Sequence, residues 1–405
     1  MNLADIVDTA AAIRLRQRLQ PEGGPGDKIF PPTFAGGVYC WEQRRIDGKT
    51  VPCVLLDSVA SQANRFEEAL EAAAQSGLEL PRLVVQFDGD LADIGEISTL
   101  AAPHRVFDAI LRDSALDGMP FFKSPLYRQL TACNTRNATA LFAHAPSALV
   151  FGCWDSTGAA GGLGNKFARA LSSEIVGVGA EWGATQGGLR QDPLGVSADV
   201  EIAITEDGDW SLAERDADKS ARGKKERAKG TRPSEINHGN VLVKVESGEQ
   251  QRVLADNRIE SYKATLRGGV TVDHALQTTV LSLAALRRLR FPVDGAAGDT
   301  GRAARAVLAA LALVAVTGGR ERGGWLRSRC GLVAESRQDF EIVHADGTTA
   351  PLALDAGQAA AIYADAVTAA RKAGLPWHAE PIRLVPQPKL AELVKMSRQV
   401  QKIGG

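Results

Sequence analysis

The sequence predicts an α+β or mixed α/β fold with large insertions, and three observations support this prediction. Patterns typical of strands and of helices alternate along most of the 405 residues. A glycine-rich segment at 151–170 joins two of these elements. Residues 211–240 then break the regular pattern with a polar, strongly basic stretch. The length alone would suggest two or three domains and allows a substantial core.

The first half of the chain predicts helices separated by strands. Asp57 or Ser58 can cap a helix that runs to about residue 75, because apolar residues recur on one of its faces. Residues 82–87, RLVVQF, predict a strand. Residues 103–114 predict a helix that starts at a proline and carries an apolar stripe.

The middle of the chain predicts a strand, a glycine-rich loop and a helix. The strand is expected at 148–154, and Lys166 and Arg169 are expected on the first turns of the helix after the glycines. Farther along, we expect strands at 200–205, 241–245 and 269–272, and long helices at about 274–289 and 300–316.

The glycine-rich loop has the chemistry of an anion site. Glycines can adopt positive φ and expose backbone N–H groups, and the two cations that follow would add charge. Phosphate is the expected anion. The loop is not a P-loop, because Asn165 stands before Lys166 and Phe167 replaces the metal-holding hydroxyl. The alternative is a glycine-rich turn that only packs a helix on a sheet.

A second basic feature lies between Lys219 and Arg232. This stretch holds seven cations and one acid, and it has no apolar residue larger than alanine. We therefore expect a mobile loop in the free protein, either a solvated insertion or an arm that becomes ordered on a phosphate backbone. A smaller cluster of arginines lies around Trp325: Arg320, Arg322, Arg327 and Arg329. It either combines charge with a stacking surface or is a plain exposed loop.

Composition excludes several classes of protein. Apolar residues make up 44% and charged residues 23%, and the formal net charge of −1 gives no global attraction to nucleic acid or to a membrane. The five cysteines form no CxxC pair, which favours a reducing cytoplasm. Residues 1–19 are typical of an amphipathic helix instead of a signal sequence. The longest apolar run, 306–316, is too short to cross a bilayer.

Catalytic patterns are weak. The sequence has no GxSxG, no HExxH and no histidine pair at i and i+4. His238 lies among amide side chains in PSEINHGN, a composition that favours hydrogen bonds to sugar, base or backbone turns over acid–base chemistry. Asp155 and Ser156 could hold a metal, but capping of the loop needs fewer coincidences. We therefore expect no enzyme activity, no metal and no cofactor.

These segments together resemble the backbone subunits of type I-G (formerly I-U) CRISPR surveillance complexes, which belong to the RAMP superfamily. The matching stretches keep one order from about residue 30 to residue 291: LDSVASQANRFE, APHRVFDAILRDS, NATALF, ALVFGCWDSTGAAGGLGNKFARALSSEIVG, DPLG, PSEINHGN and GGVTVDHALQTTVLSLAALRRLRF. The departures at Ala60, Phe66 and Cys153 are small. The tail beyond about Arg337 and the basic insertion carry little of the resemblance.

The resemblance implies an α+β fold with an RRM-like (ferredoxin-like) core and large insertions. Residues 1–405 would form one subunit with a basic insertion loop at 211–240 and a helical C-terminal elaboration at 338–405. Several copies would stack along one CRISPR guide RNA and support target DNA pairing, with a projecting hairpin or thumb over the guide. The further partners implied are guide-end-binding and large subunits and a recruited helicase-nuclease.

A subunit that accepts any guide sequence must grip phosphate and ribose without reading base edges. The low aromatic content, 5%, argues against the usual stacking platform of RRM proteins. The expected RNA-binding residues are Gly161, Gly162, Gly164, Asn165, Lys166, Arg169, Gln62, Asn64, Arg65, Arg105, Asn237, His238, Asn240, Lys224, Lys225, Arg227 and Lys229. Two alternatives remain: a RAMP-type RNA-cleaving nuclease that uses His238 or Asp155, and a nucleotide-binding protein that uses the glycine-rich loop.

Overall fold

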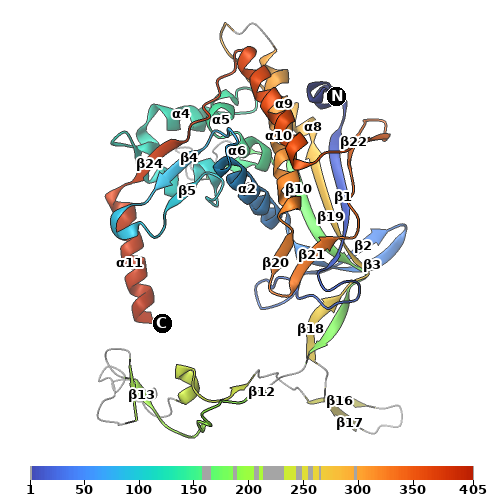
Figure 1. Cartoon of the computed structure of the whole chain (residues 1–405), viewed down its shortest axis with the longest axis vertical. Helices are drawn as coiled ribbons and strands as arrows, with labels where there is room; N and C mark the ends of the chain where they lie inside the picture. The colour runs from blue at the N-terminus through green and yellow to red at the C-terminus, as the bar shows by residue number, and fades with distance from the viewer. Residues whose placement is uncertain are drawn as a thin grey trace. The chain divides into compact units, whose positions relative to one another are not determined.

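The chain has an α+β fold made of two compact units. The computed structural model describes residues 2–156, 166–185, 189–204, 209–212, 232–242, 249–253, 259–263, 266–295 and 299–404 (Figure 1). The larger unit comprises Met1–Glu181 and Thr271–Gly405, and the smaller unit comprises Trp182–Val270. The smaller unit is thus an insertion into the larger one.

A large antiparallel sheet forms the centre of the larger unit. Its strand order is β2-β3-β10-β19-β1-β21-β20, and β22 pairs with both β1 and β23. The bounds of these strands are β1 Ala12–Pro21, β2 Trp41–Ile46, β3 Lys49–Asp57, β10 Leu171–Val178, β19 His274–Ser282, β20 Gly324–Arg327, β21 Cys330–Ala334, β22 Phe340–Val343 and β23 Thr349–Leu352.

The middle of this sheet has the order of an RRM-like core. Along the chain, β1 is followed by helix α2 (Val59–Gln75), then β10, β19, helix α9 (Thr300–Glu321) and β21. In the sheet these strands lie in the order β10-β19-β1-β21, with every neighbouring pair antiparallel. This is the β-α-β-β-α-β arrangement of ferredoxin-like proteins. The β2–β3 hairpin extends one edge, and the small unit is inserted between β10 and β19.

The two helices cover one face of the sheet because the central strands alternate buried and exposed residues. On β1, Ile13, Leu15, Gln17 and Leu19 are buried, and the three arginines between them are exposed or half-buried. The buried residues face α9, which packs against α2, α1 (Leu3–Thr9) and α10 (Ala356–Lys372). The opposite face of β1 carries its exposed and half-buried residues.

Helix α9 is nearly continuous in apolar residues because it is surrounded by protein. It is the one helix in the described part of the chain that is long and apolar enough to span a membrane, by length and composition only. However, 72% of that apolar window is buried within the fold. The prediction of a helix at 300–316 is confirmed, and Asp299 caps it by accepting a hydrogen bond from the Arg302 N–H at 2.9 Å.

Two predicted helices are strands. The N-terminal helix ends at Thr9, and residues 12–21 form β1. Residues 274–282 form β19, followed only by the short helix α8 (Leu283–Leu286). The two strands pair along eight residues, from Ala12 opposite Ser282 to Leu19 opposite Ala275. This long-range pairing overrides the helical propensity of both segments, and burial alternates along each strand as a result.

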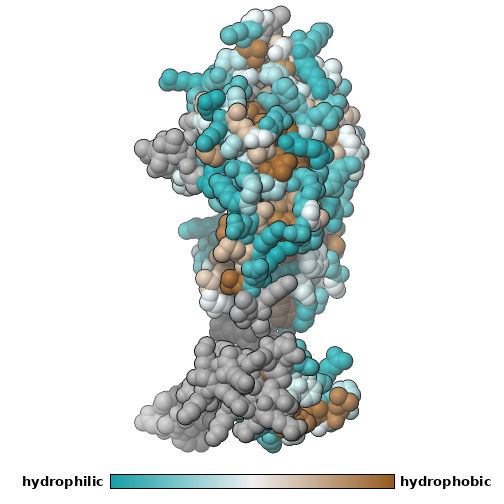
Figure 2. All heavy atoms as spheres, turned by 90° about the vertical axis from the view of Figure 1, so that its left-hand side faces the viewer, coloured by the Kyte–Doolittle hydropathy of each residue, from teal (hydrophilic) through white to brown (hydrophobic). Residues whose placement is uncertain are grey.

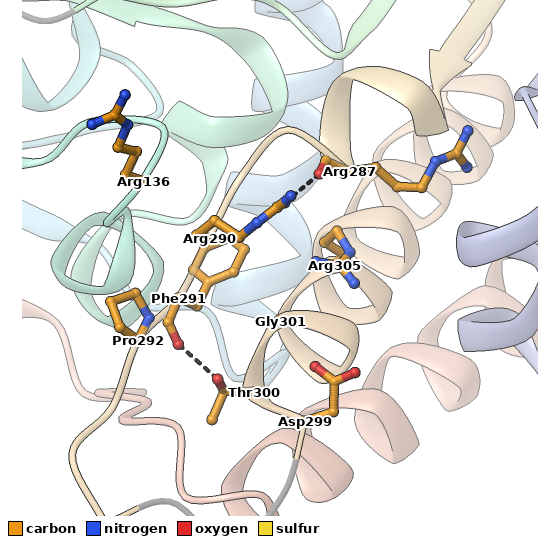
Figure 3. A pocket seen from close by; sticks show the side chains of 9 residues that line it. All are labelled: Arg136, Arg287, Arg290, Phe291, Pro292, Asp299, Thr300, Gly301 and Arg305. Carbon is orange, nitrogen blue, oxygen red and sulfur yellow. Dashed lines mark hydrogen bonds between the residues drawn. The ribbon is translucent and has the colours of Figure 1, made fainter.

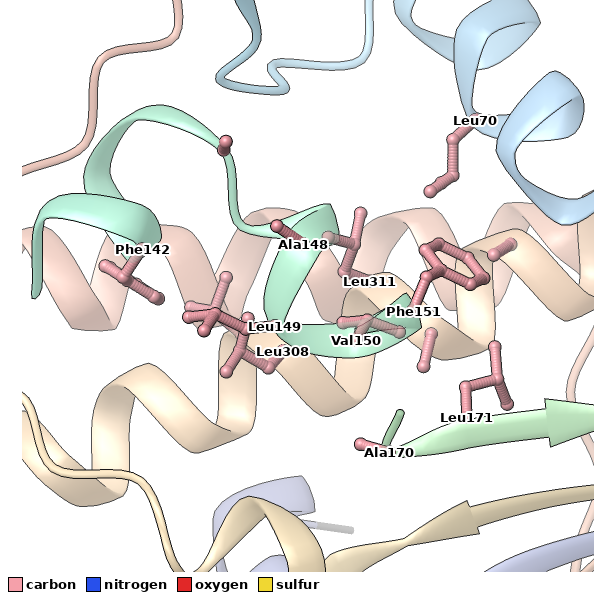
Figure 4. Close-up of a cluster of buried hydrophobic side chains, with 14 of the residues drawn as sticks. Leu70, Phe142, Ala148, Leu149, Val150, Phe151, Ala170, Leu171, Leu308 and Leu311 are labelled. Carbon is pink, nitrogen blue, oxygen red and sulfur yellow. The ribbon is translucent and has the colours of Figure 1, made fainter. Parts of the chain in front are cut away.

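The strand predicted at 148–154 is present only at its end, as β8 (Cys153–Trp154), and the helix predicted after the glycines is wrong because strands β9 (Lys166–Phe167) and β10 follow them. Residues 147–151 form helix α6 (Ser147–Phe151), and β8 pairs with β9. A short apolar run cannot be assigned to strand or helix from periodicity alone. Here α6 lies over α9, and its side chains interleave with Leu308 and Leu311 (Figure 4).

Other predicted elements are matched more closely. Helix α2 starts after Ser58, which accepts a hydrogen bond from the Ser61 N–H, and β4 (Leu83–Gln86) confirms the strand at 82–87. The helix expected at 103–114 is divided into a 3₁₀ turn, η2 (Arg105–Phe107), and α3 (Ala109–Arg112). Asp108 ends the first and caps the second.

A second sheet joins the C-terminal part of the chain to its first half. Its order is β5-β4-β24-β6-β7, with β24 parallel to β4, and helix α11 follows it. The face of the larger unit in Figure 2 is mainly hydrophilic with small separate hydrophobic areas. The remaining elements named here are β5 Glu96–Ser98, β6 Ser114–Leu116, β7 Met119–Pro120, β24 Ile382–Pro386, α4 Pro125–Ala132, α5 Thr139–His144 and α11 Pro388–Gly404.

The small unit is built from short two-stranded pairs. The expected strands at 200–205, 241–245 and 269–272 correspond to β13 (Ala203–Ile204), β15 (Val241–Leu242) and β18 (Leu266–Thr271). Their partners are β14 Trp210–Ser211, β12 Leu189–Arg190 and β11 Glu181–Thr185, and β16 Glu249–Val253 pairs with β17 Ile259–Lys263. Most of the predicted basic loop, residues 213–231, lies outside the described residues.

Candidate nucleic-acid interface

An exposed aromatic–cation pair stands where the glycine-rich segment leaves the fold. Trp154 on β8 lies directly opposite Lys166 on β9, and the Lys166 ammonium is 5.6 Å from the centre of the Trp154 ring. The Trp154 residue is 47% exposed. An exposed indole can stack on a base while the neighbouring ammonium contacts a phosphate. The predicted contacts Gly161, Gly162, Gly164 and Asn165 lie outside the described residues.

A buried ion pair holds the chain just before this hairpin. Arg105, at φ 54°, donates from Nε and Nη2 to the two Glu67 carboxylate oxygens at 2.6 and 2.7 Å, and from Nη1 to the Gly152 carbonyl at 3.1 Å. The Glu67 side chain is only 2% exposed and that of Arg105 12%. Burial raises the pKa of Glu67 in spite of the two bonds from Arg105. Arg105 is therefore placed to position the hairpin, with its donors already occupied.

Arg169 and Gly152 also hold the start of the β8–β9 hairpin, which we call the hairpin root together with Glu67 and Arg105. The Arg169 Nε donates to the Phe151 carbonyl at 3.1 Å, and burial together with the nearby Arg105 charge lowers the pKa of Arg169. Gly152 has φ 81°, and a Cβ there would lie 3.0 Å from the Phe167 carbonyl oxygen. Because Lys166 lies on β9 and Arg169 precedes β10, the expected contribution of a helix N-terminus to anion binding is wrong here.

The predicted contacts on α2 are divided between a buried network and the surface. The Gln62 amide donates to Asp57 at 2.6 Å and accepts from Ser173 and Gln277 at 2.9 and 2.8 Å, so it links helix to sheet. Arg65 donates from Nε to Asp57 at 2.9 Å and from Nη1 and Nη2 to carbonyls of β20.

Asn64 is the predicted α2 contact that remains available to a ligand. It is exposed, whereas Gln62 is 3% exposed and satisfied by its neighbours.

In the small unit, the residues of PSEINHGN stabilise a turn. Asp192 accepts backbone N–H bonds from Leu194, Val196 and Gly239, and these bonds lower its pKa. The Asn240 side chain accepts from the Asp192 N–H at 2.8 Å, while Asn237 ends η5 (Pro233–Ile236) at φ 61°. The His238 ring packs edge-on against Trp210 at 5.8 Å. The backbone-turn role that the amides allowed is present for Asn240.

Part of the cluster around Trp325, namely Trp325 itself with Arg320 and Arg322, lines a cavity of about 620 Å³ between α2, the end of α9 and the β20–β21 hairpin. Trp325 is 63% exposed, so it can offer a stacking surface. Two of its arginines are engaged within the fold: Arg320 donates to Gln17 at 3.1 Å, and Arg327 donates to the Pro31 carbonyl at 3.0 Å. The last four cations that the sequence singled out, Lys224, Lys225, Arg227 and Lys229, lie outside the described residues.

The structure also shows a set of cations that the sequence analysis missed. On the side of the sheet opposite the buried residues of β1, this strand presents Arg14, Arg16 and Arg18 at alternate positions, and the edge strand β2 adds Arg44, which pairs with Glu174, and the next residue, Arg45. Four of these five line a cavity of about 310 Å³ with β10 and β19. We call this set the arginine face: Arg14, Arg16, Arg18, Arg44 and Arg45.

Carboxylates hold several of these side chains in place. Arg14 donates to Glu341 at 2.7 Å, Arg18 to Glu335 at 2.9 Å and Arg44 to Glu174 at 2.7 Å. Arg16 is exposed and has no hydrogen bond or ion pair from its side chain within the described ranges. The ion pairs therefore orient the row, and Arg16 is left to contact a ligand.

A signal for this face was present in the sequence. In IRLRQRL, every second residue from Arg14 to Arg18 is an arginine, and the residues between them are buried. Read with a period of two, the segment is a strand with one cationic and one buried face. The expectation of a helix at 1–19 concealed this pattern.

A match to a known protein family covers most of the site residues described above. Residues 13–182 match the model of the family described as CRISPR-associated protein GSU0053, a stretch that includes β1, the arginine face, α2 and the root of the glycine-rich segment. No curated protein matches the chain. The matched stretch, fewer than half of the residues, is similar to a CRISPR-associated protein family, and this supports a role in CRISPR defence.

Proposed function

We propose that the chain is a guide-RNA-binding backbone subunit of a type I-G Cascade-like complex. The observation that carries the proposal is the arginine face on one side of an RRM-like sheet, within the stretch that matches a CRISPR-associated family. Arginine presents a planar fork of donors to phosphate and does not select a base when it contacts only the backbone. Such a surface suits a guide whose sequence varies.

The other contacts add to this grip. Lys166 and Trp154 would hold a nucleotide beside the glycine-rich segment, and the basic segment 219–232 would add counterion release. Several copies would stack along the guide in the cytoplasm, together with target DNA, guide-end-binding and large subunits and a recruited helicase-nuclease.

A salt titration of RNA binding tests the arginine face. In Arg14→Gln/Arg16→Gln, the affinity for a single-stranded RNA should fall, and the slope of log K against log salt should flatten by about 1.4 if both arginines contact phosphate. The control, Arg128→Gln/Arg288→Gln, removes the same charge from exposed arginines away from this face. Equal behaviour of the two variants would contradict the proposal.

A second variant tests the hairpin. Lys166→Ala/Arg169→Ala should weaken RNA binding, whereas Lys123→Ala/Arg128→Ala should not. Lys123 lies 5.5 Å from the exposed Phe122 ring, so it forms a similar surface cation–aromatic pair elsewhere. An unchanged affinity and salt slope in the first variant would leave the hairpin a packing role only.

We further propose that the subunit does not cleave RNA. Asp155 is buried on the larger unit, at 4% exposure, and His238 belongs to a turn of the small unit. Incubation of the purified protein with Mg²⁺ or Mn²⁺ should leave guide and complementary RNA intact. Cleavage that is lost in His238→Ala or Asp155→Ala would establish the nuclease alternative instead.

A further inference from the structure

A second arginine-rich cavity lies at the start of α9, away from the arginine face. It has a volume of about 630 Å³ and is walled by residues 287–292 after α8, the first turns of α9 and the turn before α5 (Figure 3). Its lining includes four arginines and one acid, which gives a formal charge of +3. We call it the arginine pocket, after Arg136, Arg287, Arg290 and Arg305.

Two of these arginines are fixed by the fold. The Arg287 Nη1 donates to the Val7 and Ala10 carbonyls at 2.7 and 2.6 Å, at the end of α1. The Arg305 side chain is 13% exposed, and its Nη2 makes a long contact of 3.5 Å with the Asp8 carboxylate. The buried Arg305 Nε has no hydrogen-bond partner among the residues that the structure describes.

Arg305 is thus a largely buried cation with too few acceptors. Burying such a group lowers the stability of the fold unless a further acceptor binds its free donors. Its Nη1 lies over Gly301, where a Cβ would come within 2.9 Å of it. The glycine leaves room for the guanidinium at the floor of the pocket.

The other two arginines are exposed at the mouth of the pocket. Arg290 donates from Nη1 to the Arg287 carbonyl at 2.5 Å. The Arg136 side chain makes no hydrogen bond or ion pair inside the described part of the chain. Both can therefore turn toward a bound anion without breaking a carboxylate pair.

The lining favours phosphate over a nucleobase. Its aromatic residue, Phe291, is 2% exposed and offers no ring face for stacking. Charge and hydrogen-bond donors remain, including the Thr300 and Gly301 N–H groups that precede the Arg302 N–H capped by Asp299. We propose that the arginine pocket binds phosphate groups of a nucleic-acid backbone, at a second place on the subunit.

The pocket and the arginine face belong to opposite sides of the core. The pocket includes the start of α9, and α9 covers the face of the sheet that carries Ile13 and Leu15. The arginine face is on the other side of β1. The pocket would therefore contact a different strand, or a different part of the same strand, and the inference does not depend on the proposed guide site.

Binding of two labelled single strands, thirty uridines and thirty thymidines, tests the inference with the full chain. Arg136→Gln/Arg290→Gln should weaken the binding of at least one strand and flatten its salt slope by about 1.4 relative to wild type. Arg128→Gln/Arg288→Gln, again exposed arginines outside the pocket, should do neither. If the arginine face also binds the same nucleic-acid strand, the losses of binding free energy in the pocket variant and the face variant should add when the two variants are combined, because separate sites act independently.

Inorganic tripolyphosphate separates a backbone site from a site for a free phosphate compound. If tripolyphosphate binds the wild type but not the pocket variant, and the variant binds both strands normally, the assignment to a nucleic-acid backbone is overturned. Identical binding of both strands by the pocket and control variants also overturns it. A loss confined to one strand identifies that strand as the ligand.

Discussion

The Glu67–Arg105 pair should be a main determinant of the stability of the larger unit. Glu67→Gln keeps the shape of the side chain and removes its charge, which leaves the Arg105 guanidinium buried beside a neutral group. Removing one partner of a buried pair costs about 3–5 kcal/mol. At about 2 °C per kcal/mol for a unit of this size, the unfolding temperature should fall by about 6–10 °C.

A matched pair at the surface provides the control. Arg398 also donates from two nitrogens to one carboxylate, that of Asp93, at 3.0 and 2.8 Å, but the Asp93 side chain is 64% exposed. Asp93→Asn should therefore shift the unfolding temperature very little, because solvent screens the pair. Both pairs are bidentate, through Nε and Nη2 of Arg105 and through Nη1 and Nη2 of Arg398, but the first pair is buried and the second is exposed.

A double variant completes the test. Glu67→Leu/Arg105→Met removes both charges, so it should lose less stability than Glu67→Gln, although the Gly152 carbonyl then lacks a donor. Thermal unfolding followed by circular dichroism measures all three variants. If Glu67→Gln and Asp93→Asn lower the unfolding temperature equally, the argument from burial is wrong.

Three further predictions concern the hairpin root, the pH dependence and the basic segment. Gly152→Ala should destabilise the protein by about 1–3 kcal/mol, because of its positive φ and a Cβ only 3.0 Å from a carbonyl oxygen; Gly48→Ala, at φ 78° with open space around it, should cost less in the same thermal unfolding assay. Burial lowers the pKa of His144, which stacks on His378, to about 4. Because the unfolded state then binds more protons between about pH 6.5 and 4, stability should fall as the pH falls through this range; His144→Asn should lessen that fall in urea unfolding, whereas exposed His104→Gln should not. Neutralising Lys224, Lys225, Arg227 and Lys229 of the basic segment should lower RNA affinity strongly at low salt and little at high salt, with an unchanged unfolding temperature. Normal binding of RNA by this variant at low salt would show that the segment is only a solvated insertion.

The sequence by itself determined the elements whose signals are local. Ser58 and the apolar face after it predicted α2, and the long apolar run from residue 306 predicted most of α9. The α+β class followed from the mixture of such patterns, and the match of residues 13–182 supports the CRISPR association that the resemblance implied. Caps and apolar periodicity are properties of neighbouring residues, so they are visible without a fold.

Tertiary structure alone decided the segments that are buried on every side or that pair at long range. Residues 147–151 became a helix because α9 offers an apolar surface to them, and residues 274–282 became a strand because β1 and β10 lie on both sides. Tertiary structure also decided what each cation does. Arg105 is buried by a carboxylate 38 residues away, whereas Arg16 stays open on the sheet. Whether a charge is paired or available depends on partners distant in the sequence, and no local pattern encodes them.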